Sequence, residues 1–219
     1  RDIGVTGVQT CALPISSQIT GIDPGQALFG ARVTMASMGR WLRKEAADFK
    51  NVRSPFLEHD HNKSEQLRSG LKKANRPLVG LSWQSLNAKH GASKTCSLDQ
   101  LLPILQTTNA DFIDLQYGDT SEERTRLHEA TGIAVQRVSQ IDNKLDIDGL
   151  AALIGACDIV VTVSNTTAHL AAALGKPTLV LLTWHTPLWY WHTNAMDSPW
   201  YSTAVLLRQQ SQGDARRGH

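Results

Sequence analysis

Apolar runs recur along the second half of the chain, and each is separated from the next by a polar loop or by a segment with helical spacing. The runs do not alternate with polar residues, which is typical of strands buried on both faces of a sheet. They occupy residues 77–83, 111–116, 133–138, 159–163 and 178–182, and an edge strand is predicted at 204–207. Strands that alternate with helices through short connections predict an α/β protein with a doubly wound parallel sheet.

Helices are predicted between these strands from their end signals. Ser97 can cap the helix that begins SLDQLL, and Asp99 favours its first turn. Gly132 ends a charged helix at residues 121–131, and residues 146–156 carry apolar side chains at helical spacing. Further helices are predicted at residues 38–47, at 63–75 and after Thr167 through Leu174, with a short strand at 31–35.

The junction that follows the strand at residues 159–163 carries the most distinctive polar sequence. Ser164, Asn165, Thr166 and Thr167 leave this strand and open a helix of small residues. Hydroxyl and amide side chains at such a position can cap the helix, and the N–H groups left over can hold an anion such as a phosphate. A capped helix without any ligand explains the same four residues, so the junction alone leaves both interpretations open.

Loops at the carboxyl ends of parallel strands share one edge of the sheet, where ligands bind in such folds. Lys94, Gln116 and Tyr117 belong to these loops, and His169 lies one turn into the helix after the junction. A lysine there can neutralise a phosphate, and Gln116 with Tyr117 can meet a base or a ribose. The structural alternatives are a solvated lysine, a turn with a packed tyrosine and a satisfied histidine on the helix surface.

Two further clusters have competing explanations. Aromatic residues, Trp184 and Trp191 among them, crowd into one short segment, where they either pack the chain over the sheet or offer stacking surfaces to a sugar or base. Packing is the favoured explanation for the cluster and for Trp83, whereas the sequence does not decide for Trp184. The neighbouring loop residues His59, Asp60 and His61 do not converge on one ion, so no metal site is predicted there.

The composition of the chain limits which partners and which cellular compartment are expected. The chain has 219 residues, of which 41% are hydrophobic, and a net charge of +2, which is enough apolar material for a core but gives no reason to expect a nucleic-acid partner. No apolar run approaches the length of a membrane span. Cys11, Cys96 and Cys157 are too far apart for a zinc or redox motif, so a reducing, cytoplasmic location is expected.

Five motifs occur in a fixed order between residues 76 and 209, and together they carry a family resemblance. They are VGLSW, FIDLQYGD, DIDGLAALIGACDIVVTVSNTTAHLAAALGKP, DSPWY and LLRQ. This arrangement resembles the C-terminal domain of GT-B glycosyltransferases, namely bacterial tetratricopeptide-repeat proteins related to O-linked N-acetylglucosamine transferase and, more distantly, lipopolysaccharide heptosyltransferases. The resemblance implies a Rossmann-like sheet that forms the C-terminal half of a GT-B fold. Ser164 departs from the aspartate that many relatives carry at the matching position.

The resemblance also implies a donor site. A nucleotide sugar, expected to be UDP-linked, would bind with its diphosphate over the helix N-terminus. Lys94 would stabilise the leaving diphosphate, His169 would be a second catalytic group, and Gln116 and Tyr117 would contact the donor. The other donor-binding residues would be Ser164, Asn165, Thr166 and Thr167. No cofactor and no obligatory metal are expected, because the chain has no Asp-x-Asp sequence; the acceptor, a protein or a glycan, is not specified.

The domain organisation follows from the same resemblance. Residues 1–15, RDIGVTGVQTCALPI, look like a translated sequencing adaptor and are expected to be disordered and foreign to the protein. Residues 16–75 would be a remnant of the N-terminal GT-B domain with its linker, residues 76–209 the nucleotide-sugar-binding domain, and residues 210–219 a polar tail. The expected function is that of a truncated glycosyltransferase. The alternatives are a non-catalytic nucleotide- or carbohydrate-binding module of a repeat protein and a nucleotide-sugar epimerase.

Overall fold

The computed structural model describes residues 45–49, 55–73, 75–85, 91–184, 189–191 and 196–211. The predicted adaptor at 1–15 and the predicted strand at 31–35 lie outside the described residues. The chain divides into two compact units, Arg1–Asn51 and Val52–His219. The described part of the first unit is a 3₁₀ helix at Ala46–Phe49. The second unit contains the whole sheet and the candidate site.

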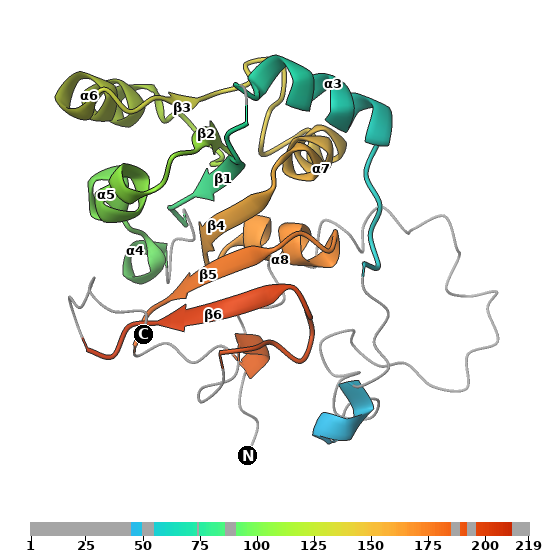
Figure 1. Ribbon diagram of the computed structural model, residues 1–219. Helices are drawn as coiled ribbons and strands as arrows, with labels where there is room; N and C mark the ends of the chain where they lie inside the picture. The colour runs from blue at the N-terminus through green and yellow to red at the C-terminus, as the bar shows by residue number, and fades with distance from the viewer. Residues whose placement is uncertain are drawn as a thin grey trace, which may run out of the picture. The chain divides into compact units, whose positions relative to one another are not determined.

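Six parallel strands form one sheet in the order β3-β2-β1-β4-β5-β6 (Figure 1). Their bounds are Leu78–Ser82 for β1, Asp111–Asp114 for β2, Val135–Gln136 for β3, Ile159–Val163 for β4, Thr178–Leu182 for β5 and Ala204–Arg208 for β6. The predicted α/β fold class with a doubly wound parallel sheet is therefore confirmed. The strand order reverses direction between β1 and β4, which places a topological switch point at the centre of the sheet.

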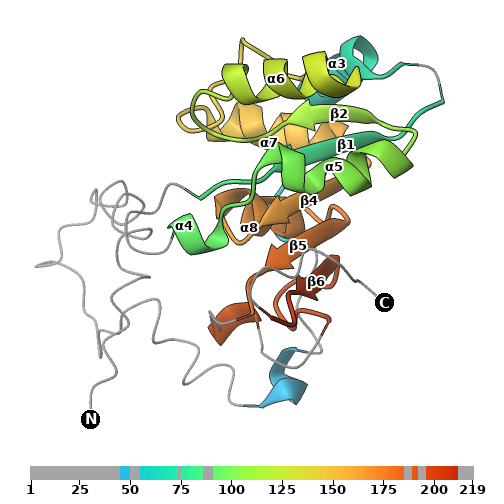
Figure 2. The ribbon, with the colours of Figure 1, turned by 90° about the vertical axis from the view of Figure 1, so that its left-hand side faces the viewer.

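Helices cover both faces of this sheet (Figure 2). Their bounds are His61–Leu71 for α3, Gly91–Lys94 for α4, Leu98–Thr107 for α5, Ser121–Thr131 for α6, Ile147–Ala156 for α7 and Thr166–Ala173 for α8, with a 3₁₀ turn at Trp189–Trp191. Helices α5 and α6 lie on one face, and α7 and α8 on the other, where α3 packs along α7. No described helix has the length and apolar character to cross a membrane.

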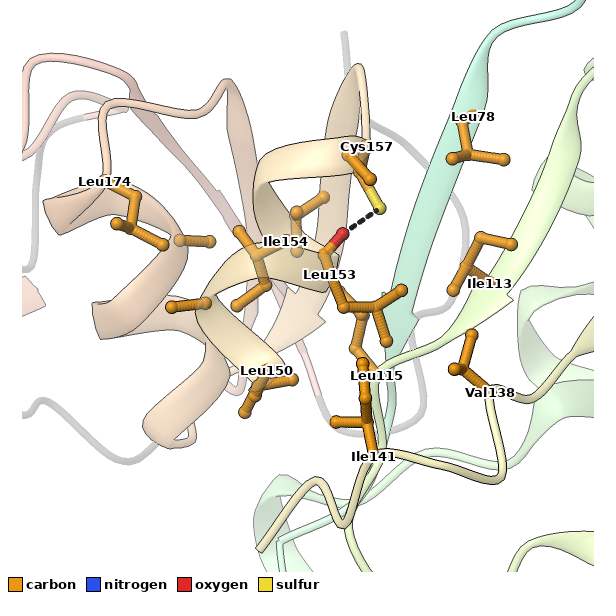
Figure 3. Packing of buried hydrophobic residues seen from close by; sticks show 14 residues of the cluster. Leu78, Ile113, Leu115, Val138, Ile141, Leu150, Leu153, Ile154, Cys157 and Leu174 are labelled. Carbon is orange, nitrogen blue, oxygen red and sulfur yellow. Dashed lines mark hydrogen bonds between the residues drawn. The ribbon is translucent and has the colours of Figure 1, made fainter. Parts of the chain in front are cut away.

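The core under α7 and α8 fixes how these helices sit on the sheet (Figure 3). Leu153 and Ile154 of α7 are fully buried against strand residues that include Leu78 and Ile113. Burying each such side chain stabilises the fold by about 2 kcal/mol. This close packing needs a glycine at position 80, because a Cβ there would lie 2.4 Å from a methyl carbon of Leu115. The result is a rigid platform beneath the loops at the carboxyl edge.

The opposite face has its own core, centred on Trp83. This indole is 0% exposed and packs with Leu98 and Leu101 of α5, Phe112 of β2 and other buried side chains. The prediction that Trp83 is a packing residue is therefore confirmed. Its position at the end of β1 makes the first residue of the following loop part of the core.

Helix ends agree with the signals in the sequence. Ser97 accepts a hydrogen bond from the N–H of Gln100, and the Gln100 side chain accepts one from the N–H of Ser97, which completes a capping box. Gly132 ends α6 in the left-handed region with φ 74°, which an L side chain rarely adopts. Asp60 caps α3, so this helix begins at His61 and ends at Leu71 rather than spanning 63–75.

Two further predicted elements differ from the structure. Strand β3 covers only Val135 and Gln136 instead of residues 133–138. It is the edge strand, and the next residue, Arg137, already turns its side chain to Asp114. The loop predicted at residues 84–95 contains the helical turn α4, which ends at Lys94.

Candidate functional site

The switch point between β1 and β4 is where the candidate site residues come together. The segment after β1, residues 83–97, leads to α5 on one face of the sheet and carries Lys94. The junction after β4 is short and leads directly to α8 on the other face. Chains that leave neighbouring parallel strands toward opposite faces open a ligand site between them.

Asn165 ties the two sides of the switch point together. Its side-chain oxygen accepts hydrogen bonds from the N–H of Ala168 at 3.3 Å and from the hydroxyl of Thr162 at 3.1 Å. Its amide nitrogen donates to Ser82 Oγ at 2.8 Å and to the Gln84 carbonyl at 3.1 Å. The predicted helix cap is confirmed. The amide is fully used by the protein, so any contact of Asn165 with a ligand falls to its backbone.

Thr166 and Thr167 form the first turn of α8, and their backbone N–H groups point out of the helix N-terminus. No hydrogen bond within the described part of the chain uses either group. Unused N–H groups at this position carry the positive end of the helix dipole, which favours an anion. The Thr166 residue is exposed, so this end of α8 is accessible.

Ser164 lies just before this turn and is nearly buried, with 7% of its surface exposed. Its hydroxyl oxygen accepts a hydrogen bond at 2.8 Å from the indole N–H of Trp191, which is 1% exposed. The side chain of Ser164 therefore anchors the 3₁₀ turn that contains Trp191. The favoured packing explanation is confirmed for Trp191, whereas Trp184 is 47% exposed.

The imidazole of His169 is in contact with three aromatic rings. Its imidazole stacks on Trp191 with 4.8 Å between the centroids and meets Tyr190 edge-on at 5.0 Å. Nδ1 lies 3.0 Å from the hydroxyl of Tyr201. Burial, together with the positive charge of Lys94, lowers the pKa of His169 to about 4. The ring is therefore neutral at neutral pH.

The hydrogen-bond partner of His169 Nδ1 is the hydroxyl of Tyr201. Burial raises the pKa of Tyr201 to about 12, so its hydroxyl keeps its proton and can donate it to Nδ1. When the hydroxyl donates, Nε2 carries the imidazole proton, and when Nδ1 carries the proton the hydroxyl accepts, so the contact fits either tautomer. The catalytic role expected for His169 stays a prediction.

Lys94 ends the helical turn α4 and is partly buried. Its positive charge contributes to the lowered pKa of His169 in α8. In Figure 1, α4 lies on the side to which the arrowheads of β4 and β5 point. The sequence placed Lys94 and His169 on one rim, and their roles at a donor site stay predictions.

Gln116 lies inside the protein rather than on the rim. It is 0% exposed, and its side-chain oxygen accepts hydrogen bonds from Ser82 Oγ, the Trp83 N–H and the Gln84 N–H at 3.0, 3.1 and 2.9 Å. The end of β1 leaves these donors without strand partners, and the amide of Gln116 supplies the acceptor. In this structure Gln116 therefore holds the start of the loop, and its expected contact with the donor stays a prediction. Tyr117 is partly buried at the same edge.

A buried charge cluster beside Gln116 was not predicted. Asp114 is 0% exposed and lies 3.3 Å from Nε of Arg124 and 3.2 Å from a guanidinium nitrogen of Arg137. Burial raises the pKa of Asp114, whereas the Thr120 hydroxyl and Arg137 act in the opposite direction. The signal available in the sequence was an aspartate at the end of an apolar strand, but its partners come from α6 and the segment after β3.

Metal binding has no support from the described residues. No three His, Cys, Asp or Glu side chains gather there as ligands would. The rings of His59 and His61 lie 4.5 Å apart without a third ligand among the residues the structure covers. The expected absence of an obligatory metal stays a prediction.

Known proteins resemble this chain in sequence and in fold. FlbA from Caulobacter vibrioides is 37% identical over 142 residues, which are 64% of this chain and 24% of FlbA. The ADP-heptose lipopolysaccharide heptosyltransferase II of Escherichia coli superposes with a TM-score of 0.51 at 17% identity, over 80% of this chain and 54% of that one. The glycosyl transferase family 9 structure from Veillonella parvula gives 0.50 at 15% identity, over 70% and 42%. The chain thus spans about a quarter of FlbA and about half of the structural relatives.

These two structures support the fold, and the sequence supports the family. The shared fold agrees with the predicted C-terminal half of a GT-B glycosyltransferase. The model of glycosyltransferase family 9 (heptosyltransferase) matches residues 53–215, which include the whole sheet and every candidate site residue. The chain therefore belongs to glycosyltransferase family 9.

Proposed function

We propose that this domain binds the nucleoside-diphosphate sugar donor of a glycosyltransferase, with the diphosphate over the N-terminus of α8. The observation that carries the proposal is the pair of unused N–H groups of Thr166 and Thr167 at the switch point of the sheet. His169 follows in the same helix, and the charge of Lys94 acts on its ring. Together they offer hydrogen-bond donors and one cation to a group that carries negative charge.

The same groups suit the chemistry of sugar transfer. The bond between the anomeric carbon and the diphosphate oxygen breaks, a bond to an acceptor hydroxyl oxygen forms, and negative charge develops on the departing diphosphate. Lys94 and the N–H groups of α8 would stabilise that charge where it appears. The base that takes the acceptor's proton is not assigned to any described residue, and the acceptor stays a protein or a glycan.

The identity of the donor's nucleotide is the more specific part of the proposal. The sequence led us to expect a UDP-linked donor, whereas the Escherichia coli structural relative is named for ADP-heptose. Membership of the heptosyltransferase family makes ADP the first probe and UDP the second. The relationship to tetratricopeptide-repeat proteins stays a prediction, as does a role as a non-catalytic module or an epimerase.

The proposed diphosphate site at the backbone N–H groups of Thr166 and Thr167 can be tested by removing one of these donors. Thr166 occupies the first helical position of α8, where proline fits the helix but has no N–H, and Asn165 before it is already extended (φ −137°, ψ −173°). Thr166→Pro should weaken ADP binding about tenfold, since a hydrogen bond to a charged group contributes about 1.5 kcal/mol. Isothermal titration calorimetry with ADP and UDP measures this effect.

Thr166→Ala is the matched control, because it removes the side chain and keeps the N–H. It should bind the nucleotide within about twofold of the unaltered protein, well below the effect of losing a charged hydrogen bond. Equal nucleotide affinities of the proline and alanine variants would contradict a role of the Thr166 N–H in binding the diphosphate. A lack of binding by the unaltered protein to both nucleotides would contradict the proposed function itself.

A further inference from the structure

Glu123 makes three hydrogen bonds that neither the sequence nor the proposed donor site explains. One oxygen of its carboxylate accepts from the indole N–H of Trp83 at 2.8 Å and from the side-chain amide of Gln84 at 2.9 Å. The other oxygen accepts from the backbone N–H of Leu98 at 2.7 Å. Glu123 belongs to α6, so all three donors come from a distant part of the chain.

The three donors sit at the two ends of one segment. Trp83 and Gln84 begin the segment after β1, and Leu98 is the first residue of α5, which ends it. A carboxylate is suited to this place because it accepts on both oxygens at once and because Leu98 N–H belongs to a helix N-terminus. The side chain of Glu123 therefore joins the two ends of the segment that carries Lys94. These two ends, residues 83–85 and 95–98, are called the base of the segment.

Other hydrogen bonds stiffen the same base. The N–H of Cys96 donates to the carbonyl of Trp83 at 2.9 Å, and the Thr95 hydroxyl accepts from the N–H of Ser85 at 3.0 Å. Lys94 directly precedes these paired residues. Its backbone position is consequently set by the closed base, to which Glu123 contributes the only carboxylate seen among the described hydrogen bonds of residues 83–85 and 95–98.

We infer that Glu123 is a positioning residue: it joins the two ends of the 83–98 segment and so fixes the backbone from which the Lys94 side chain reaches the donor diphosphate. The inference rests on the proposed function. Glu123 acts through Lys94 and does not touch the nucleotide, because both of its oxygens are used by the protein.

The inference predicts energetic coupling between Glu123 and Lys94. Glu123→Gln replaces one oxygen by an NH₂ group, which faces N–H donors and cannot accept from them. This variant should lower the affinity for ADP about fivefold in the unaltered background and less than about twofold in a Lys94→Ala background, as expected for residues that act as one unit. Calorimetry on the four proteins completes the double-mutant cycle.

Glu129→Gln is the control, because it makes the same chemical change at an exposed position of the same helix. It should leave ADP affinity unchanged in both backgrounds. Trp83→Phe provides a second route if Glu123→Gln does not fold: it keeps an aromatic ring in the core, removes the indole N–H, and should weaken ADP binding by a smaller factor that also depends on Lys94.

The outcomes separate the inference from the function on which it rests. If Lys94→Ala weakens binding but Glu123→Gln and Trp83→Phe have no effect, or have the same effect in both backgrounds, Glu123 is not a positioning residue and the proposed function stands. If Lys94→Ala has no effect while Thr166→Pro does, the inference fails because Lys94 is not a diphosphate ligand. If the unaltered protein binds neither ADP nor UDP, both fail.

Discussion

The two sides of the switch point are built in opposite ways. After β4, the chain reaches α8 through a short junction whose side chains are used by the fold: Ser164 holds Trp191, and Asn165 bridges β1 and β4. After β1, the chain makes a longer excursion to α5, held at its base by Gln116 and Glu123. One side is a rigid junction, and the other is a loop with a closed base.

The difference concerns which atoms are left for a ligand. At the junction the side chains of Ser164 and Asn165 are occupied, whereas the backbone N–H groups of Thr166 and Thr167 are unused within the described part of the chain. In the loop the backbone is hydrogen-bonded at both ends of the segment, and the group proposed to bind the ligand is the Lys94 side chain. We therefore expect changes at the junction to affect stability and binding together, whereas a change at Lys94 should affect binding alone.

The largest effect on stability is expected from Asn165→Ala. This change removes the cap of α8 and leaves four hydrogen-bonding partners of a nearly buried amide to find others. The free energy of unfolding should fall by about 3 kcal/mol, combining the loss of a cap with that of buried hydrogen bonds. Urea denaturation measures it. Asn165→Asp, which keeps the capping oxygen, should lose less; an equal loss in both variants would show that the bridge to β1 matters more than the cap.

The second effect is a pH dependence carried by His169. Burial lowers its pKa from 6.5 to about 4 in the folded protein, so the unfolded chain binds more protons between these values. The stabilisation is complete above the unfolded pKa and is lost as the pH falls toward 4. Between pH 7 and pH 5 this amounts to about 2 kcal/mol. Urea denaturation of the unaltered protein and of His169→Gln at both pH values isolates it; equal losses in the two would exclude His169 as the cause.

The smallest effect on stability is expected from Lys94→Ala. Lys94 lies at the end of a short helical turn and is only partly buried, so its removal should change the free energy of unfolding by less than about 0.5 kcal/mol. The same variant should weaken ADP binding about tenfold, as for the loss of a charged partner. A large loss of stability in Lys94→Ala would contradict the expectation that a change in the loop affects binding alone.

Much of the fold followed from local sequence signals, because each of these signals depends on neighbours in the chain. The apolar runs at 159–163 and 178–182 are strands with the predicted bounds, and Asn165 and Ser97 cap the helices that follow them. Strand β3 was overestimated, since an edge strand with one neighbour ends where its side chains find other partners.

The site was predicted less completely, because its supports join elements that are distant in sequence. Gln116 is recognisable as an internal acceptor only once β1 lies beside β2, and Glu123 only once α6 lies beside the start of α5. The aromatic surroundings that make His169 neutral likewise depend on Tyr201 from the far end of the chain. Side-chain type and spacing cannot show such contacts.

The proposed diphosphate site depends most directly on the backbone N–H groups at the start of α8. Two-dimensional NMR of the ¹⁵N-labelled protein during titration with ADP observes these groups themselves. The proposed site predicts that the amide signals of Thr166 and Thr167 move downfield with the largest shifts in the protein, at a midpoint equal to the calorimetric Kd. Saturable ADP binding that leaves both signals unmoved, with its largest shifts elsewhere on the sheet, would contradict the proposed site.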